Sequence, residues 1–169
     1  MRRSASDHTA AGASGAGVAE ADRHWMAVAL REAIAAGRRG EVPVGAVVVS
    51  GAKAIARAGN ASIRTSDPAG HAEVRALRAA GRRARNYRLT DATLYVTVEP
   101  CAMCMGAAIQ ARVARLVFGC ADPKAGAAGS LYDLASDARL NHRVLVTAGV
   151  DAETSRGLLR AFFHQRRGR

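Results

Sequence analysis

Residues 93–104 read TLYVTVEPCAMC. The first six residues are typical of a buried strand. Because Pro100 suits the first position of a helix, we predict that the chain turns through Glu99 and becomes helical near Cys101. Cys101 and Cys104 would then share one helix face, in the first turn, where unpaired N–H groups favour the thiolate form of cysteine. Two thiolates on one face make half of a tetrahedral zinc site.

A third ligand is available upstream in His71. Residues 67–70 read DPAG, which predicts a turn, and the residues after His71 are apolar at helical spacing. Three protein ligands leave one coordination position open, which is typical of catalytic zinc, and a water held there ionises near neutral pH. Glu73 does not share a helix face with His71, so we predict that it reaches this water as a proton shuttle.

His-x-Glu followed by Pro-Cys-x-x-Cys is the signature of zinc-dependent nucleobase deaminases. Cys120 leaves one alternative open. It either fills the end of a strand as a small buried side chain, or it supplies a fourth ligand and turns the site into a structural zinc knuckle.

The composition predicts one globular domain. A chain of 169 residues with 49% apolar residues can build a proper core. We expect residues 1–18, rich in Ala, Gly and Ser, to be a disordered tail, and residues 19–169 to form the domain. Three cysteines do not suggest a disulfide framework, which favours a reducing compartment, the cytoplasm. We find no apolar stretch typical of a signal peptide or a membrane span.

The net charge of +11 favours an anionic partner, with nucleic acid first. Nearly all of the basic residues are arginine, so a GC-rich genome is an alternative explanation. The arginines between residues 75 and 88 form either a solvated face or a phosphate contact. Phenylalanines lie beside arginines near the C-terminus, and they either stack on single-stranded nucleic acid or dock onto the domain.

The remaining elements follow from periodicity and turn signals. Asp22 is expected to cap a first helix that ends at Gly37, and Asp151 a last helix. We predict strands at 44–49, 54–57, 93–98, 115–118 and 143–147, and helices at 71–81 and 101–112, with 93–118 forming a parallel βαβ unit. Asn60 lies in a loop, where it either caps a turn or reads a base edge. His142 is expected to be a hydrogen-bonded loop residue.

Further motifs carry a resemblance to one family. They are EVPVGAV at 41–47, HAE at 71–73, NYRL at 86–89, DATLYVT at 91–97, EPC at 99–101, GAAGSL at 126–131, NHR at 141–143 and the Phe162-Phe163 pair. From about Trp25 to Arg167 the chain resembles the bacterial tRNA-specific adenosine deaminases, which convert the wobble adenosine of an arginine tRNA anticodon to inosine. The N-terminal extension and Cys120-Ala121 depart from the family pattern.

The resemblance implies a three-layer α/β/α, cytidine-deaminase-like fold with a mixed five-stranded sheet. It implies a homodimer that binds the tRNA anticodon stem-loop, with one Zn²⁺ per subunit. His71, Cys101 and Cys104 match the zinc ligands, and Glu73 matches the proton donor. Positions matching the base and anticodon pocket are Val44, Asn60, Ala72 and Asp122, and those matching the anticodon-contacting tail are Phe162, Phe163 and Arg166.

The predicted function is therefore hydrolytic deamination of adenosine to inosine in a tRNA anticodon, with release of ammonia. Two alternatives remain open. One is a deaminase of a free nucleobase such as guanine, which would use the same chemistry. The other is a non-enzymatic RNA-binding domain in which Cys120 completes a structural zinc site.

Overall fold

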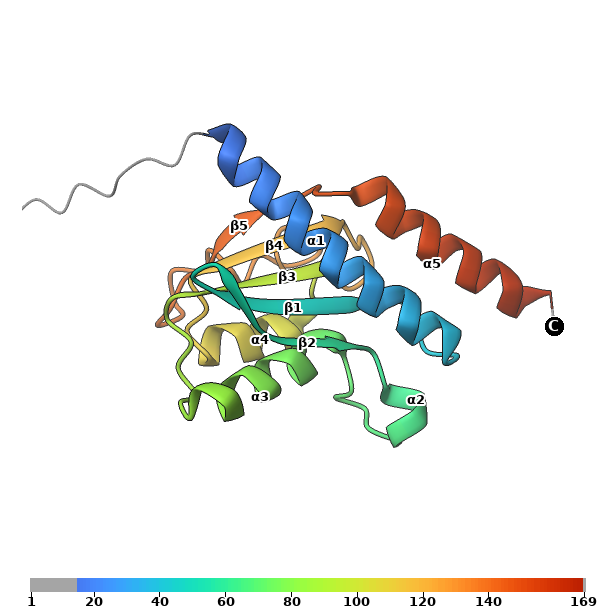
Figure 1. Ribbon diagram of the computed structural model, residues 1–169, viewed down its shortest axis with the longest axis horizontal. Coiled ribbons are helices and arrows are strands. Elements are labelled where there is room, and N and C mark those ends of the chain that lie inside the picture. Colours follow the sequence, from blue (N-terminus) through green and yellow to red (C-terminus); the bar gives the residue numbers. More distant parts are fainter. Residues whose placement is uncertain (1–14, 169) are drawn as a thin grey trace, which may run out of the picture.

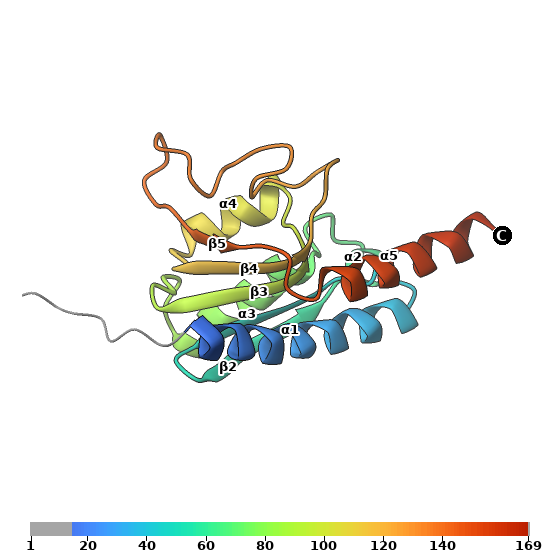
Figure 2. The ribbon, with the colours of Figure 1, turned by 90° about the horizontal axis from the view of Figure 1, so that it is seen from above.

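A computed structural model describes residues 15–168 and shows a mixed five-stranded sheet between two layers of helices (Figures 1 and 2). The strands are β1 (Gly45–Ser50), β2 (Lys53–Gly59), β3 (Ala92–Val98), β4 (Arg115–Cys120) and β5 (Leu145–Thr147). The helices are α1 (Gly15–Arg38), α2 (Ser62–Thr65), α3 (Ala72–Ala84), α4 (Ala102–Gln110) and α5 (Ala152–Arg167). Helices α1 and α5 cover one face of the sheet, and α3 and α4 cover the other. The predicted three-layer fold class is confirmed.

The sheet has the order β2-β1-β3-β4-β5. Strand β1 pairs antiparallel with both β2 and β3, whereas β3, β4 and β5 run parallel to one another. The predicted parallel unit is therefore present as β3-α4-β4. Because helices cover both faces, the central strands are buried on both sides, which explains their nearly continuous apolar sequence.

Each face of the sheet packs its own apolar cluster. The cluster under α3 and α4 is the larger and includes Leu94, Met105 and Leu116, all fully buried. The cluster under α1 is built around Met26, Val47 and Val117. The larger cluster holds α3 and α4 side by side on the sheet, and this fixes where their N-terminal ends meet.

Helix α1 begins at Gly15, so Asp22 lies inside it and the predicted helix cap at Asp22 is wrong. Asp22 is 3% exposed, and its carboxylate accepts two hydrogen bonds from Arg115, at 2.8 and 2.7 Å, and one from the Tyr95 hydroxyl at 3.0 Å. Residues 15–18, expected in the tail, are helical, and the expectation for residues 1–14 lies outside the described part of the chain. The side chain of Asp22 therefore caps no helix and instead connects α1 to strands β3 and β4.

Other boundaries also differ from prediction. Pro100, expected at the first position of the helix, lies before α4, whose N-cap is Cys101; the helix predicted at 101–112 runs from Ala102 to Gln110. The strand predicted at 143–147 is reduced to Leu145–Thr147, since Val144 turns inward to hydrogen-bond the carbonyl of Ala135. The short helix α2 was not predicted. It forms because the buried Glu41 carboxylate accepts the N–H groups of Ile63 and Arg64, at 3.1 and 2.7 Å.

His142 is hydrogen-bonded, as predicted, through Nε2 to the carbonyl of Val113 at 2.8 Å. Within residues 15–168, every helix is too short or too polar to cross a bilayer.

Candidate metal centre and active site

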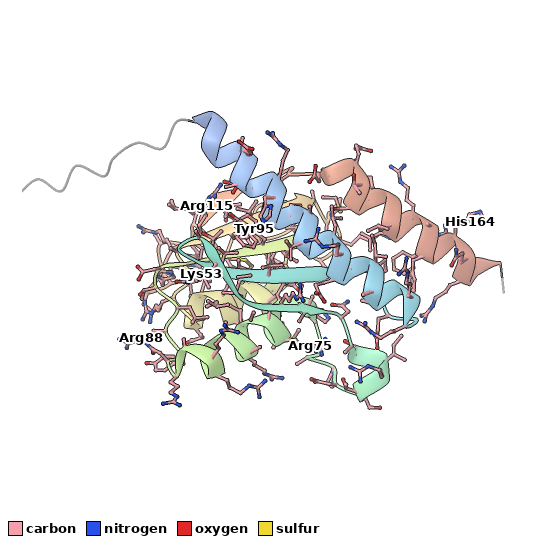
Figure 3. The ribbon with its side chains drawn as sticks, in the orientation of Figure 1. Lys53, Arg75, Arg88, Tyr95, Arg115 and His164 are labelled. Carbon is pink, nitrogen blue, oxygen red and sulfur yellow. The ribbon has the colours of Figure 1, made fainter. Side chains whose placement is uncertain are left out.

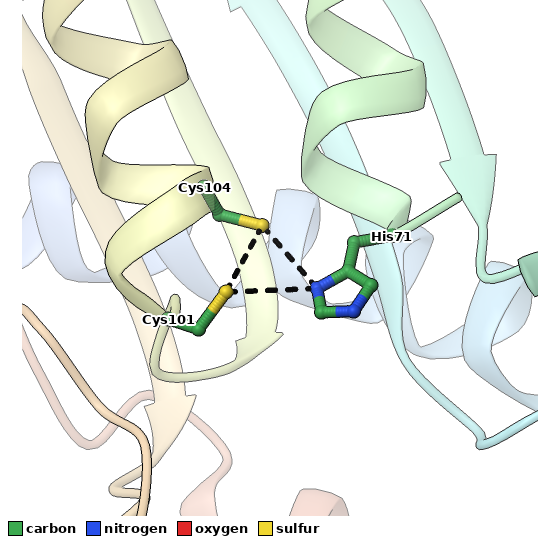
Figure 4. Close-up of side chains that lie close together, drawn as sticks. All are labelled: His71, Cys101 and Cys104. Atoms are coloured by element: carbon green, nitrogen blue, oxygen red, sulfur yellow. Dashed lines mark hydrogen bonds between the residues drawn. The ribbon is translucent and has the colours of Figure 1, made fainter. Parts of the chain in front are cut away.

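The three predicted ligands meet where the N-terminal ends of α3 and α4 lie together (Figure 4). His71 and Cys101 are the N-cap residues of the two helices, and Cys104 lies one turn into α4. The Nδ1 atom of His71 is 3.7 Å from Sγ of Cys101 and 3.5 Å from Sγ of Cys104, and the two sulfurs are 3.7 Å apart. Two chain segments thirty residues apart thus present one nitrogen and two sulfurs to a common point.

These separations fit a tetrahedral zinc ion. With Zn–S near 2.3 Å, Zn–N near 2.05 Å and tetrahedral angles, two sulfurs should lie about 3.8 Å apart and a sulfur and a nitrogen about 3.6 Å apart. The observed values of 3.7 Å, and of 3.5 and 3.7 Å, agree with both. The three ligand atoms therefore could hold a metal without rearrangement.

The three ligand side chains shift one another's pKa values. The hydrogen bond with Cys104, followed by that with His71, lowers the pKa of Cys101 to about 3. The hydrogen bond with Cys101, together with burial, raises the pKa of Cys104. The hydrogen bond with Cys101 raises the pKa of His71. A metal ion would bind the deprotonated forms of these groups, so its binding would release protons.

Glu73 lies in the first turn of α3, two residues after His71, and is 4% exposed. Burial is the largest influence on its carboxyl group and raises its pKa. A buried carboxyl group with a raised pKa takes up and releases a proton more easily near neutral pH than an exposed one does. Its position and its environment suit a proton carrier.

A cavity of about 200 Å³ opens over the ligand cluster. Among the predicted residues, those in its lining are Val44, Asn60, His71, Glu73, Cys101 and Asp122. Cys104 is fully buried behind the cavity. The lining also includes Val42, Val98, Glu99 and Ala125, which were not predicted. Val42 lies in the motif EVPVGAV and Glu99 in the motif EPC. Their places in these two family motifs were the sequence feature that could have identified them as cavity residues.

Ala72 is fully buried and does not line the cavity. Its backbone N–H donates to Oδ1 of Asn60 at 2.8 Å. This hydrogen bond orients the Asn60 amide and leaves its Nδ2 group as a donor at the cavity. The link between Ala72 and the cavity is therefore indirect, through Asn60. The two explanations offered for Asn60 are compatible, since its side chain bonds the start of α3 and also faces the cavity.

The C-terminal helix places its three predicted residues differently. Phe163 is 45% exposed and lines a groove of about 580 Å³ that adjoins the cavity and shares Val42, Val44, Val98 and Asp122 with it. Phe162 packs edge-on against Phe163 and lies under the guanidinium of Arg166, 4.7 Å from its ring centre. Arg166 also donates to the carbonyl of Gly40 at 2.9 Å. Only Phe163 of the three faces the groove.

Cys120 is buried at the end of β4 and is not part of the cluster of ligand atoms. Its carbonyl accepts the N–H of Glu99 at 2.9 Å. Among the described residues the cluster consists of His71, Cys101 and Cys104 alone. Cys120 therefore fills the strand end, and the fourth-ligand alternative has no support in the structure.

Comparisons with known proteins agree with this arrangement. Residues 20–167 match the MafB19-like deaminase family. A tRNA-specific adenosine deaminase of Haemophilus influenzae is 48% identical over 149 residues, which cover 88% of this chain and 86% of that protein.

Two solved structures are also similar. One, from a study of A-to-I editing by tRNA:A34 deaminases at the wobble position of transfer RNA, has a TM-score of 0.78 and 42% identity, covering 80% of this chain and 99% of the other. A guanine deaminase of Bacillus subtilis has a TM-score of 0.57 and 34% identity over 58% of this chain and 63% of its own. On its sequence, fold and ligand cluster, the chain belongs to the tRNA-specific adenosine deaminases.

Proposed function

We propose that this protein deaminates the wobble adenosine of a tRNA anticodon to inosine, with an arginine tRNA as the expected substrate. The observation that carries the proposal is a buried carboxyl group, Glu73, beside a His-Cys-Cys cluster whose spacing fits zinc. In the reaction the oxygen of a water molecule replaces the exocyclic amine at C6, and ammonia leaves. Anticodon bases are unpaired, so turning one into the cavity costs little.

We propose one Zn²⁺ per chain, held by His71, Cys101 and Cys104. A zinc ion held by three protein ligands would supply an ionised water near neutral pH. The carboxylate of Glu73 would take one proton of the attacking water and deliver it to N1 of the base. Glu73 would then take the remaining proton from the new hydroxyl group at C6 and pass it to the departing amine, so that both protons of the water are accounted for.

The remaining cavity residues position the base. Val42, Val44 and Val98 offer apolar walls against which a purine can pack. Asn60 presents its Nδ2 donor, held by the Ala72 contact, to a ring acceptor of the base. Asp122 lies where the cavity meets the groove and can accept a hydrogen bond from the ribose.

The groove beside the cavity is the proposed path of the flanking nucleotides. Its basic lining consists of Lys124, Arg156, Arg160 and Arg167, and Phe163 provides an aromatic face for stacking. Arg88 and Lys53 lie at the opposite end of the molecule from His164 of α5 (Figure 3). The chain thus offers basic residues beside the cavity and others remote from it.

Replacing Arg160 and Arg167 by alanine is expected to weaken binding of an anticodon stem-loop. Each lost phosphate contact should reduce the slope of log K against log salt by about 0.7. The measurement is a salt titration of binding by fluorescence anisotropy. Arg88→Ala is the matched control, since it removes an exposed arginine at the remote end. Equal losses in the control and in the groove variant would contradict the proposed path.

The direct test of the function is incubation with total tRNA, followed by mapping of inosine. Inosine at the first anticodon position of an arginine tRNA is the expected result. Conversion of free guanine with no change in tRNA would instead assign the chain to base catabolism.

We also propose that the protein acts as a cytoplasmic homodimer. Supporting this, a groove of about 710 Å³ between α3 and α4 has a largely apolar floor that includes Val74, Leu77, Ala107 and Ala111. Burying such a groove against a second copy would remove apolar surface from water. Sedimentation equilibrium is expected to give twice the chain mass, and a monomer at micromolar concentration would reject the dimer. Free thiols at the site suit a reducing compartment.

A further inference from the structure

Glu99 is a second buried carboxylate at the cavity, and both of its oxygens accept hydrogen bonds from the protein. Its side chain is 3% exposed. Oε1 accepts the backbone N–H groups of Ala128 and Ser130, at 3.0 and 2.9 Å. Oε2 accepts the backbone N–H of Asp122 at 3.0 Å and also the Ser130 hydroxyl. A carboxylate offers about four lone-pair sites, and all of them are used within the protein.

This saturation separates Glu99 from Glu73. A carboxylate without a free lone pair cannot also bind substrate or carry a proton. Its four donors all come from residues 122–130, so its role is to hold that segment.

The held segment forms one wall of the substrate cavity. Asp122 and Ala125 line the cavity, and Gly126 forms an isolated bridge with the metal-ligand residue Cys101. A Cβ atom added at Gly126 would lie 2.4 Å from Cδ of Glu99, so only glycine lets the segment close over the carboxylate. Glu99 itself lies directly after β3, which fixes it to the sheet.

We propose that Glu99 is the positioning residue that sets the substrate wall of the cavity, and in particular holds Asp122 at the junction of the cavity and the groove. The proposal rests on the proposed function for the identity of the substrate. It assigns Glu99 no contact with the substrate and no step in the chemistry.

The variant Glu99→Gln tests this with little change in shape. A glutamine must turn its NH₂ group toward one of the two donor sets. The less costly choice is the Oε2 side, because the Ser130 hydroxyl can rotate to accept, whereas Ala128 and Ser130 both present backbone N–H groups to Oε1. The N–H of Asp122 then loses its acceptor, and those of Ala128 and Ser130 keep theirs.

Amide hydrogen exchange measured by NMR on the full chain reads this out without any substrate. The Asp122 amide is expected to exchange roughly tenfold faster in Glu99→Gln, with smaller changes at Ala128 and Ser130. Gly126→Ala disturbs the same contact from the segment rather than from Glu99, because the added Cβ atom would press against the Glu99 carboxylate. Amide exchange should therefore be faster across residues 122–130. Unchanged exchange at Asp122 in both variants would overturn the proposal.

The kinetic test uses an anticodon stem-loop. KM is expected to rise roughly tenfold in Glu99→Gln while kcat stays within about twofold, because the wall moves and the reacting groups do not. Asp22→Asn is the matched control, since it disturbs another buried carboxylate, remote from the cavity, and should lower the melting temperature without changing KM. If KM rises in both variants as the melting temperature falls, the role of Glu99 is structural only.

The hydrogen-exchange measurement and the kinetic measurement test this proposal separately from the proposed function. If the wild-type protein does not deaminate RNA, the exchange measurement still decides whether Glu99 holds Asp122. If the protein deaminates RNA and the exchange rates respond but KM does not, Glu99 holds the loop without setting substrate binding, and the proposal is rejected.

Discussion

Replacing Glu73 by glutamine is expected to lower kcat for deamination of an anticodon stem-loop by about 10²- to 10⁴-fold, the range that a positioned proton carrier contributes. Glutamine has nearly the same shape as glutamate, so the buried site should keep its packing. It cannot accept the proton of the attacking water or return one to N1 and to the leaving amine. The measurement is single-turnover conversion of adenosine to inosine, with zinc content and melting temperature recorded for the same preparation.

The control for this prediction lies in the ligand cluster itself. Glu73→Gln should retain about one zinc per chain, because Glu73 is not one of the three grouped ligand residues. Loss of activity together with zinc would mean that the side chain supports the metal rather than the proton transfer. Turnover within tenfold of wild type would remove Glu73 from the mechanism.

Replacing Cys104 by alanine is expected to abolish metal binding, from about one zinc per chain to less than about a tenth. Cys104 is fully buried, and its loss leaves only His71 and Cys101, two ligands where a catalytic zinc site has three. Activity should fall to background. The melting temperature should also fall, because metal binding contributes to folding free energy when the ligands come from distant segments. Zinc is measured by atomic absorption after gel filtration.

Cys120→Ala is the matched variant, because Cys120 is also a buried cysteine but lies outside the ligand cluster. It should keep its zinc and most of its activity, at the modest cost in stability of removing a small buried side chain. Zinc retained in Cys104→Ala, or lost in Cys120→Ala, would contradict the assigned ligand set.

The ligand cluster was predictable because its signals are local. Each half of the signature lies at a helix start, and Cys101 at the N-cap of α4 and Cys104 in its first turn bring their sulfurs to 3.7 Å from each other. That His71 meets them depends on α3 and α4 lying together on the sheet, and the sequence indicated this only through the signature that joins His-x-Glu to Pro-Cys-x-x-Cys. The fold class followed from the family resemblance.

The features that the sequence did not reveal depend on contacts between distant segments. Asp22 looks like a helix cap, but its partners Tyr95 and Arg115 come from β3 and β4. Glu99 looks like part of a turn, and its role depends on donors from residues 122–130. Arg166, expected in the anticodon-contacting tail, also contacts Gly40 and Phe162. No local periodicity encodes such pairs.

The order of the strands also bears on how copies of this chain can associate. The outer strands are β2 and β5. Strand β2 carries the exposed cations Lys53 and Arg57, and its pairing with β1 is interrupted between Val48 and Val49. Strand β5 is only three residues long. Short, charged or irregular edge strands discourage pairing with strands of other chains, so both edges of this sheet are poor templates for aggregation.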